Sequence, residues 1–136
     1  MARRSIVELA EQPEESWRLS DHATLQWLVA PNALITTTRD YSLLWRFLPT
    51  QPNETTVHTS LYTRTEVTTD AQRKRFGDAL DLQLRVTGAE DFPMQERVQS
   101  VLDSGAVPDV LIGRNEVAVH HFHQSLHALL DAAEPG

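Results

Sequence analysis

Residues 88–99 run Gly88-Ala89-Glu90-Asp91-Phe92-Pro93-Met94-Gln95-Glu96-Arg97-Val98-Gln99. If this stretch is a helix, one of its carboxylates shares a narrow face with apolar side chains, since each residue advances by about 100°. The residues of that face are Asp91, Met94, Val98, Val101 and Leu102. A carboxylate that points where methyl groups point is costly to bury as a free ion, so it needs a capping role, a cation or a metal. The choice among these three decides what the chain does.

The local pattern alone favours the helix cap. Aspartate is among the preferred N-cap residues, and proline suits the first helical turn. The pattern therefore predicts a helix over about residues 92–103, with Asp91 as its N-cap and Gly105 after its end. Because a carboxylate has two oxygens, a capping aspartate can also bind a metal. Spacing leaves the role of Asp91 open.

Length, charge and composition restrict the class of protein. The chain has 136 residues, 40% of them hydrophobic, which suits one domain with a core. Its net charge of −7 argues against binding to nucleic acid or to an anionic membrane surface. No stretch approaches the roughly 18 apolar residues of a membrane span, and no signal peptide is recognisable. We expect a cytoplasmic protein.

The absence of cysteine excludes several kinds of chemistry within this chain. Disulfides, cysteine-bound zinc, a cysteine nucleophile and a cysteine-ligated iron–sulfur cluster all need thiol groups. The phosphate-binding and nucleophile-elbow glycine motifs are also missing.

Strand patterns occupy the first half of the chain and helix patterns the second. Alternating apolar residues predict strands at about residues 24–29, 33–38, 41–48 and 55–64. Two prolines favour a loop over residues 49–54. In the first of these strands one face carries Leu25, Trp27 and Val29; in the third, one face carries Tyr41, Leu43, Trp45 and Phe47. Short connections between successive strands indicate an antiparallel meander.

The second half begins with a capping box. Thr69 and Gln72 have the spacing of this motif, so a helix is expected to start there and to break or bend near Thr87-Gly88. A last helix is expected over about residues 115–132. The predicted fold class is α+β: an antiparallel sheet packed on a long C-terminal helix, partial, of helix-grip type. The expected domain organisation is a lead-in at residues 1–20 and a single domain over residues 21–136.

Histidines of the last predicted helix form a second candidate site. His123 and His127 are four residues apart on one helical face, which is a spacing used by metal ligands, and Glu116 or another carboxylate is a possible third ligand. The alternative is that both are ordinary hydrogen-bonded side chains beside an apolar stripe. The glutamate of the zincin signature is missing, and spacing favours the alternative.

Several segments together resemble a known family. They are residues 30–35 (APNALI), 49–56 (PTQPNETT), 90–105 (EDFPMQERVQSVLDSG), 113–116 (GRNE) and 121–123 (HFH). In this order they resemble the C-terminal part of the catalytic domain of Rieske-type aromatic-ring-hydroxylating dioxygenase α subunits, over about residues 24–131. The segment after Glu90 and the pair GRNE…HFH are the more specific ones. Ala30 departs from the family, which often has an aromatic residue there.

The resemblance implies roles for individual residues. In that family two histidines and one carboxylate hold the catalytic iron and leave positions open for oxygen. Asp91 matches the carboxylate ligand, which outweighs the N-cap interpretation without excluding it. Glu90 is then expected to orient a histidine, or else to be a solvated charge at a helix start. Met94 and Phe122 are expected to line the substrate pocket, with ordinary core packing as the alternative.

The rest of the family's metal site is missing from this chain. Only His22 and His58 precede Asp91, 36 residues apart, and neither lies in the family's histidine context. One carboxylate alone does not hold Fe(II) usefully, so the iron site is expected to be incomplete here. The [2Fe–2S] cluster needs two cysteines and two histidines, so this cluster and NAD(P)H are expected to act only through other chains.

The resemblance therefore implies the C-terminal catalytic-domain portion of a non-heme iron ring-hydroxylating oxygenase acting on an aromatic or similar apolar substrate. Three explanations stay open for the chain: part of a split α subunit, a truncated remnant, or a stand-alone ligand-binding module without redox activity. Whether the chain alone is an enzyme is equally open. The expected partners are another oxygenase polypeptide or a second copy, joined at an exposed sheet edge, and a small aromatic ligand.

Overall fold

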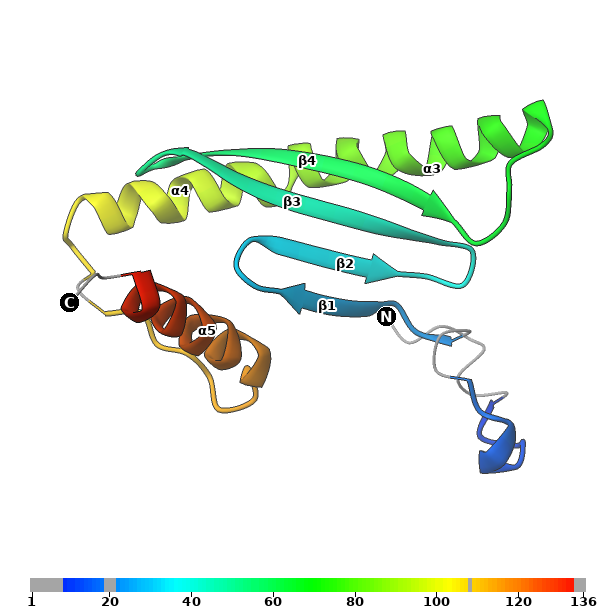
Figure 1. Ribbon diagram of the computed structural model, residues 1–136, viewed down its shortest axis with the longest axis horizontal. Helices are drawn as coiled ribbons and strands as arrows, with labels where there is room; N and C mark the ends of the chain where they lie inside the picture. Colours follow the sequence, from blue (N-terminus) through cyan, green and yellow to red (C-terminus); the bar gives the residue numbers. More distant parts are fainter. Residues whose placement is uncertain (1–8, 19–21, 108, 134–136) are drawn as a thin grey trace. The chain divides into compact units, whose positions relative to one another are not determined.

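The computed structural model describes residues 9–18, 22–107 and 109–133 (Figure 1). Its elements, in chain order, are η1 (Glu14–Ser16), β1 (Leu25–Val29), β2 (Ala33–Thr37), β3 (Tyr41–Gln51), β4 (Glu54–Thr63), α3 (Asp70–Ala89), α4 (Asp91–Asp103) and α5 (Val117–Ala133). The strands form one four-stranded sheet in the order β1-β2-β3-β4. The α+β class and the antiparallel meander are thus confirmed. Part of the expected lead-in, at residues 1–8 and 19–20, lies outside the described residues.

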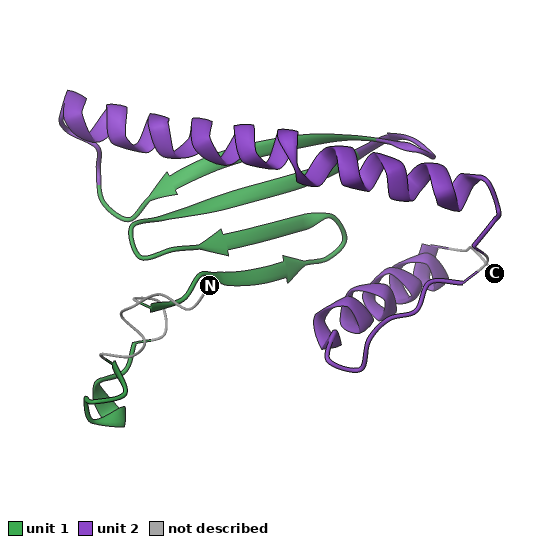
Figure 2. Cartoon of the chain, turned by 180° about the vertical axis from the view of Figure 1, so that it is seen from behind, with its two compact units in different colours: residues 1–48, 55–65 green, residues 49–54, 66–136 purple. Residues whose placement is uncertain are grey.

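The chain divides into two compact units (Figure 2). One contains residues 1–48 and 55–65, with most of the sheet, and the other contains residues 49–54 and 66–136, with the three α-helices named above. The expected packing of the sheet on the C-terminal helix stays a prediction, and so does the single domain over residues 21–136.

The register of the sheet gives both of its faces apolar side chains. Leu43 and Trp45 of β3 are the buried hydrophobic residues among those described, with exposed fractions of 1% and 6%. Trp45 lies opposite Leu34, which lies opposite Leu28, so these three share the face of Leu43. The other face carries the row Trp27, Ile35 and Leu44. Trp27 is 58% exposed, so this second apolar row is poorly covered within the described residues.

The expected loop at residues 49–54 is wrong at residues 49–51 and at Glu54, which lie in strands. Strand β3 continues through Pro49 to Gln51, and only Pro52 and Asn53 separate it from β4. The fixed φ of proline is compatible with an extended chain, and proline lacks only a donor for the ladder. The hydroxyl of Thr50 also donates to the side chain of Glu54 across this turn, at 2.8 Å. The sheet tolerates the missing backbone N–H of Pro49. The hairpin of β3 and β4 therefore extends further than the two prolines indicate.

The capping box at the start of α3 is confirmed. The side chain of Thr69 accepts a hydrogen bond from the Gln72 backbone N–H at 3.2 Å, and the side chain of Gln72 accepts one from the Thr69 N–H at 3.1 Å. These two bonds satisfy donors that a helix start otherwise leaves unpaired. Lys74 and Asp78 form an ion pair one turn further on, at 2.7 Å, and the hydrogen bond and charge of Asp78 raise the pKa of Lys74.

The interruption after α3 lies at Glu90 rather than at Thr87-Gly88. Thr87 is buried, its hydroxyl accepts a hydrogen bond from the Gln83 side chain, and the helix continues through Gly88. The N–H of Glu90 still bonds to the carbonyl of Val86, and α4 begins at the next residue. The end of α4 agrees with expectation, since Gly105 follows it with a φ of +68°, where glycine has no steric cost.

Replacement of the cap should destabilise the helical unit. We expect Thr69→Ala to lower the free energy of unfolding by about 1 kcal/mol, because the Gln72 N–H loses its acceptor. Gln72→Ala should cost a similar amount, since it removes the reciprocal half of the box. Urea unfolding followed by circular dichroism measures both changes. Gln95→Ala, at an exposed position of α4, is the matched control, and an equal loss there would show that the box contributes nothing specific.

Candidate functional site

Asp91 lies in the first turn of α4. It is the first residue of the helix, and Glu90 holds the N-cap position without a side-chain capping bond. The predicted N-cap role of Asp91 is therefore wrong. The physical reason is that α3 runs to Ala89, so the donors at the start of α4 follow an almost continuous helix instead of a free end. A carboxylate in a first helical turn still gains from the helix dipole.

The Asp91 carboxylate is exposed and available. Among the described residues it makes no hydrogen bond and no ion pair. Glu90 beside it is also exposed, and its expected role in orienting a histidine stays a prediction. Two adjacent carboxylates without partners at one helix start are acceptors that a cation or a donor from another molecule can reach.

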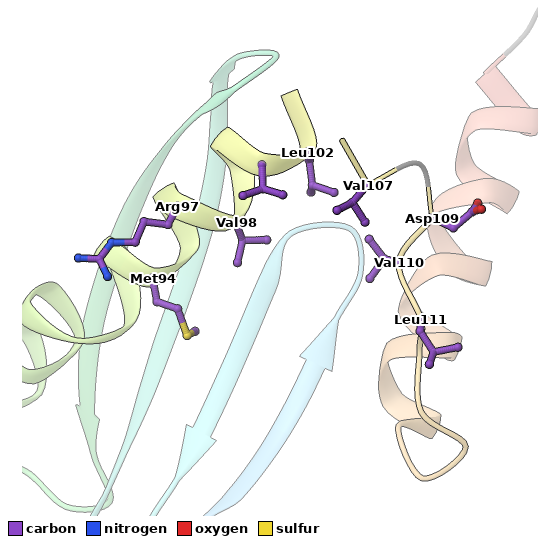
Figure 3. A pocket seen from close by; sticks show the side chains of 9 residues that line it. Met94, Arg97, Val98, Leu102, Val107, Asp109, Val110 and Leu111 are labelled. Carbon is purple, nitrogen blue, oxygen red and sulfur yellow. The ribbon is translucent and has the colours of Figure 1, made fainter. Parts of the chain in front are cut away.

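One face of α4 forms a wall of an apolar pocket (Figure 3). Four members of the apolar stripe predicted from the sequence line it: Met94, Val98, Val101 and Leu102. The opposite wall comes from the irregular segment after α4, which contributes Val107, Val110 and Leu111. The pocket has a volume of about 410 Å³, within the range of roughly 300–1,000 Å³ that is usual for small-molecule sites.

Polar groups of this pocket are few. Arg97 and Asp109 complete the lining, one from each wall. Figure 3 shows the Arg97 guanidinium and the Asp109 carboxylate directed away from the row of apolar side chains. The interior of the pocket thus suits an apolar ligand. Arg97 places a positive charge at one edge of the pocket, and Asp109 places a negative charge at another.

The predicted substrate residues have different surroundings. Met94 lines the pocket, one helical turn after Asp91, and 56% of its surface is exposed. Phe122 is half-buried in α5 and does not line this pocket; its ring meets that of His123 edge-on, with centroids 5.9 Å apart. The substrate-binding role of both residues stays a prediction. Asp91 does not line the pocket either.

The described part of the chain does not assemble a metal site with three or more protein ligands. It contains no group of three or more histidine, cysteine, aspartate or glutamate residues placed to hold a metal ion. Glu116, the suggested third ligand for the α5 histidines, instead accepts a hydrogen bond from the Gly113 N–H, which closes the turn before α5. His22 has a buried Nδ1 without a partner among the described residues, and His58 is exposed on β4.

Sequence reasoning missed the second wall of the pocket. The sequence predicts a brief extended piece over residues 110–112, but these residues, like Val107 and Asp109, have no regular secondary structure. Their signal is composition alone: three large aliphatic residues, of which Val110 and Leu111 are 67% and 96% exposed. Such exposure of apolar side chains marks contact surfaces.

Comparison with known proteins identifies the family. The family model described as "Ring hydroxylating alpha subunit (catalytic domain)" matches residues 1–132. No curated protein and no solved structure matches the chain. Among the described residues, no helix has the length and apolar character of a membrane span.

The family is one of oxygenases that use non-heme iron, and they assemble as oligomers. The residues described here do not fit that iron by themselves, because one exposed carboxylate at the start of α4 has no histidine grouped with it.

Removal of the Asp91 carboxylate should barely change stability. We expect Asp91→Ala to shift the free energy of unfolding by less than about 0.5 kcal/mol, because the lost dipole interaction is offset by the higher helix propensity of alanine. Urea unfolding under the conditions used for Thr69→Ala measures this change in the free energy of unfolding. A loss of about 1 kcal/mol, equal to that of the genuine cap, would show that Asp91 has a capping role after all.

The chain therefore belongs to the family of ring-hydroxylating α subunits, and the match is to their catalytic domain.

Proposed function

We propose that this chain is the C-terminal catalytic-domain portion of a ring-hydroxylating oxygenase that acts on an aromatic or similar apolar substrate, and that Asp91 is the carboxylate it contributes to the iron. The observation that carries this proposal is the exposed carboxylate without a partner, one helical turn before the wall of an apolar pocket. The family match over residues 1–132 supplies the reaction class.

The pocket on α4 supports the apolar substrate. Its lining is aliphatic apart from Met94, Arg97 and Asp109, so it offers a ring-shaped ligand dispersion contacts and few hydrogen bonds. Met94 is the lining residue nearest to Asp91 along the helix. A substrate against Met94 therefore lies within about one helical turn, roughly 5 Å along the axis, of the proposed ligand position.

The remaining iron ligands are proposed to come from another polypeptide. Two histidines and a carboxylate on one side of the ion leave positions open for oxygen. The described residues contain no group of three potential ligands, and a partner polypeptide is the source that we propose for the histidines. Glu90, next to Asp91, is then placed to accept a hydrogen bond from a ligand imidazole. The [2Fe–2S] cluster and NAD(P)H act through other chains, in the cytoplasm.

A second candidate function is a ligand-binding module without redox activity. It is favoured by one observation, namely that the described residues form a pocket for an apolar ligand but no metal-binding group. The two functions differ in their partner: the oxygenase portion needs a histidine-bearing polypeptide, whereas the module needs only its ligand.

The proposal is tested on the native assembly. The tagged chain is expressed in its native cells and isolated in mild salt, after which its partners are sequenced by mass spectrometry and its iron is measured. We expect a polypeptide that carries the cysteine/histidine cluster motif and the paired histidines, and iron in the isolated assembly. Asp91→Ala should leave this partner bound and remove at least about 90% of the iron, because a lost first ligand costs more than tenfold in affinity.

Glu96→Ala is the matched control, since it removes another exposed carboxylate from the same helix. Iron that persists in the Asp91→Ala assembly would contradict the ligand role of Asp91. Isolation of the chain with neither iron nor such a polypeptide would contradict the oxygenase function and favour the ligand-binding module.

A further inference from the structure

Helix α5 is rich in histidine and poor in charge. Four of its 17 residues are histidines, and its only charged residue is Asp131. Residues three, four and seven apart share a helical face, so His120, His123 and His127 lie on one flank, within about 60° of the helix circumference. His121 lies on a different side. The neutral composition and the histidine flank set α5 apart from α3, whose surface carries ion pairs.

The imidazoles of this flank are accessible. His120, His123 and His127 are all exposed, and among the described residues none of their side chains makes a hydrogen bond or an ion pair. The ring of His123 is positioned by its edge-on contact with the Phe122 ring, at an interplanar angle of 76°. Phe122 is half-buried, so this contact limits the motion of the His123 ring while leaving its nitrogens in solvent.

We propose that His123 and His127 form a two-histidine site on α5 for a divalent transition metal ion of the zinc, nickel or copper class. Side chains four residues apart on a helix have Cβ atoms about 5–6 Å apart, which allows two imidazole nitrogens to meet one ion at about 2.0–2.1 Å each. Both residues lie inside one continuous helix, so the spacing is fixed before the ion binds. After the first imidazole has bound, the second binds intramolecularly, which raises the affinity above that of a lone histidine.

The site is limited to two protein ligands from the described chain, since no group of three is found there. Water completes the coordination. Asp131 lies one further turn along the same flank and can accept a hydrogen bond from the ring N–H of a metal-bound His127, which orients the imidazole. Glu116 is not included in the site, because one of its oxygens accepts the Gly113 N–H bond in the turn before α5. The general order of affinities predicts that copper binds more tightly than nickel or zinc.

This site is separate from the proposed iron ligand. It uses α5 and not α4, and it needs nitrogen ligands that Asp91 does not supply. Binding of ions to α5 therefore does not depend on the oxygenase function, and the two proposals can fail independently.

The test is isothermal titration of the whole chain with zinc chloride and with copper(II) chloride. We expect His123→Ala and His127→Ala each to weaken the tightest binding at least tenfold, and the double variant to lose it. The electron paramagnetic resonance spectrum of the copper complex should show coupling to nitrogen, and this coupling should weaken in either variant. Alanine is the best helix former, so α5 should persist, and circular dichroism checks this.

His121→Ala is the matched control, because it removes a histidine of the same helix from outside the flank. An equal loss of affinity in His121→Ala, or unchanged binding in the double variant, would overturn the proposal. Asp91→Ala should leave the titration unchanged, so a failure here is distinguishable from a failure of the iron-ligand assignment.

Discussion

A single carboxylate without a partner is the constraint on which the functional account depends. Asp91 begins α4 with both of its oxygens uncommitted, and the same helix goes on to form one wall of an apolar pocket. An isolated carboxylate binds a divalent ion weakly, whereas a carboxylate with two histidines forms an iron site with open positions. The chemistry expected from the family therefore requires ligands that the described residues do not bring together.

Both units expose apolar surface of a kind that suits the proposed partner. In the sheet, Trp27 and Val29 are exposed on the face opposite Leu43 and Trp45. In α4, Met94 and Val98 are more than half exposed. Apolar patches of this kind commonly mark contact surfaces, and a sheet edge can pair with a further strand. A polypeptide that supplies the missing histidines would have apolar surface on which to bind.

Local sequence signals predicted most of the elements. The capping box of Thr69 and Gln72 and the alternation around Leu43 depend on neighbours in the chain, so they could be read directly. That Asp91 does not cap α4 could not be read from the sequence. The outcome depends on where α3 ends, and a sequence specifies the ends of helices only weakly. The strand through Pro49 was missed because a pattern does not show which ladder donors are needed.

The candidate site was predictable only in part. The α4 wall of the pocket follows from helical periodicity, but its second wall does not, since Val107, Val110 and Leu111 lie outside any helix or strand. The proposal that Asp91 is an iron ligand rests on the family resemblance and not on spacing. The histidines that we propose to come from another polypeptide leave no pattern in this sequence, so their position could not be predicted from it.

Photo-crosslinking from α4 tests the central claim most directly. A photoreactive amino acid in place of Met94, one turn from Asp91, is activated in the native assembly, and the captured peptide is sequenced. The account predicts a peptide from another polypeptide that carries paired histidines a few residues apart. Capture of peptides only from this chain, or of a partner peptide without histidines, would contradict the claim that Asp91 completes an iron site with a second polypeptide.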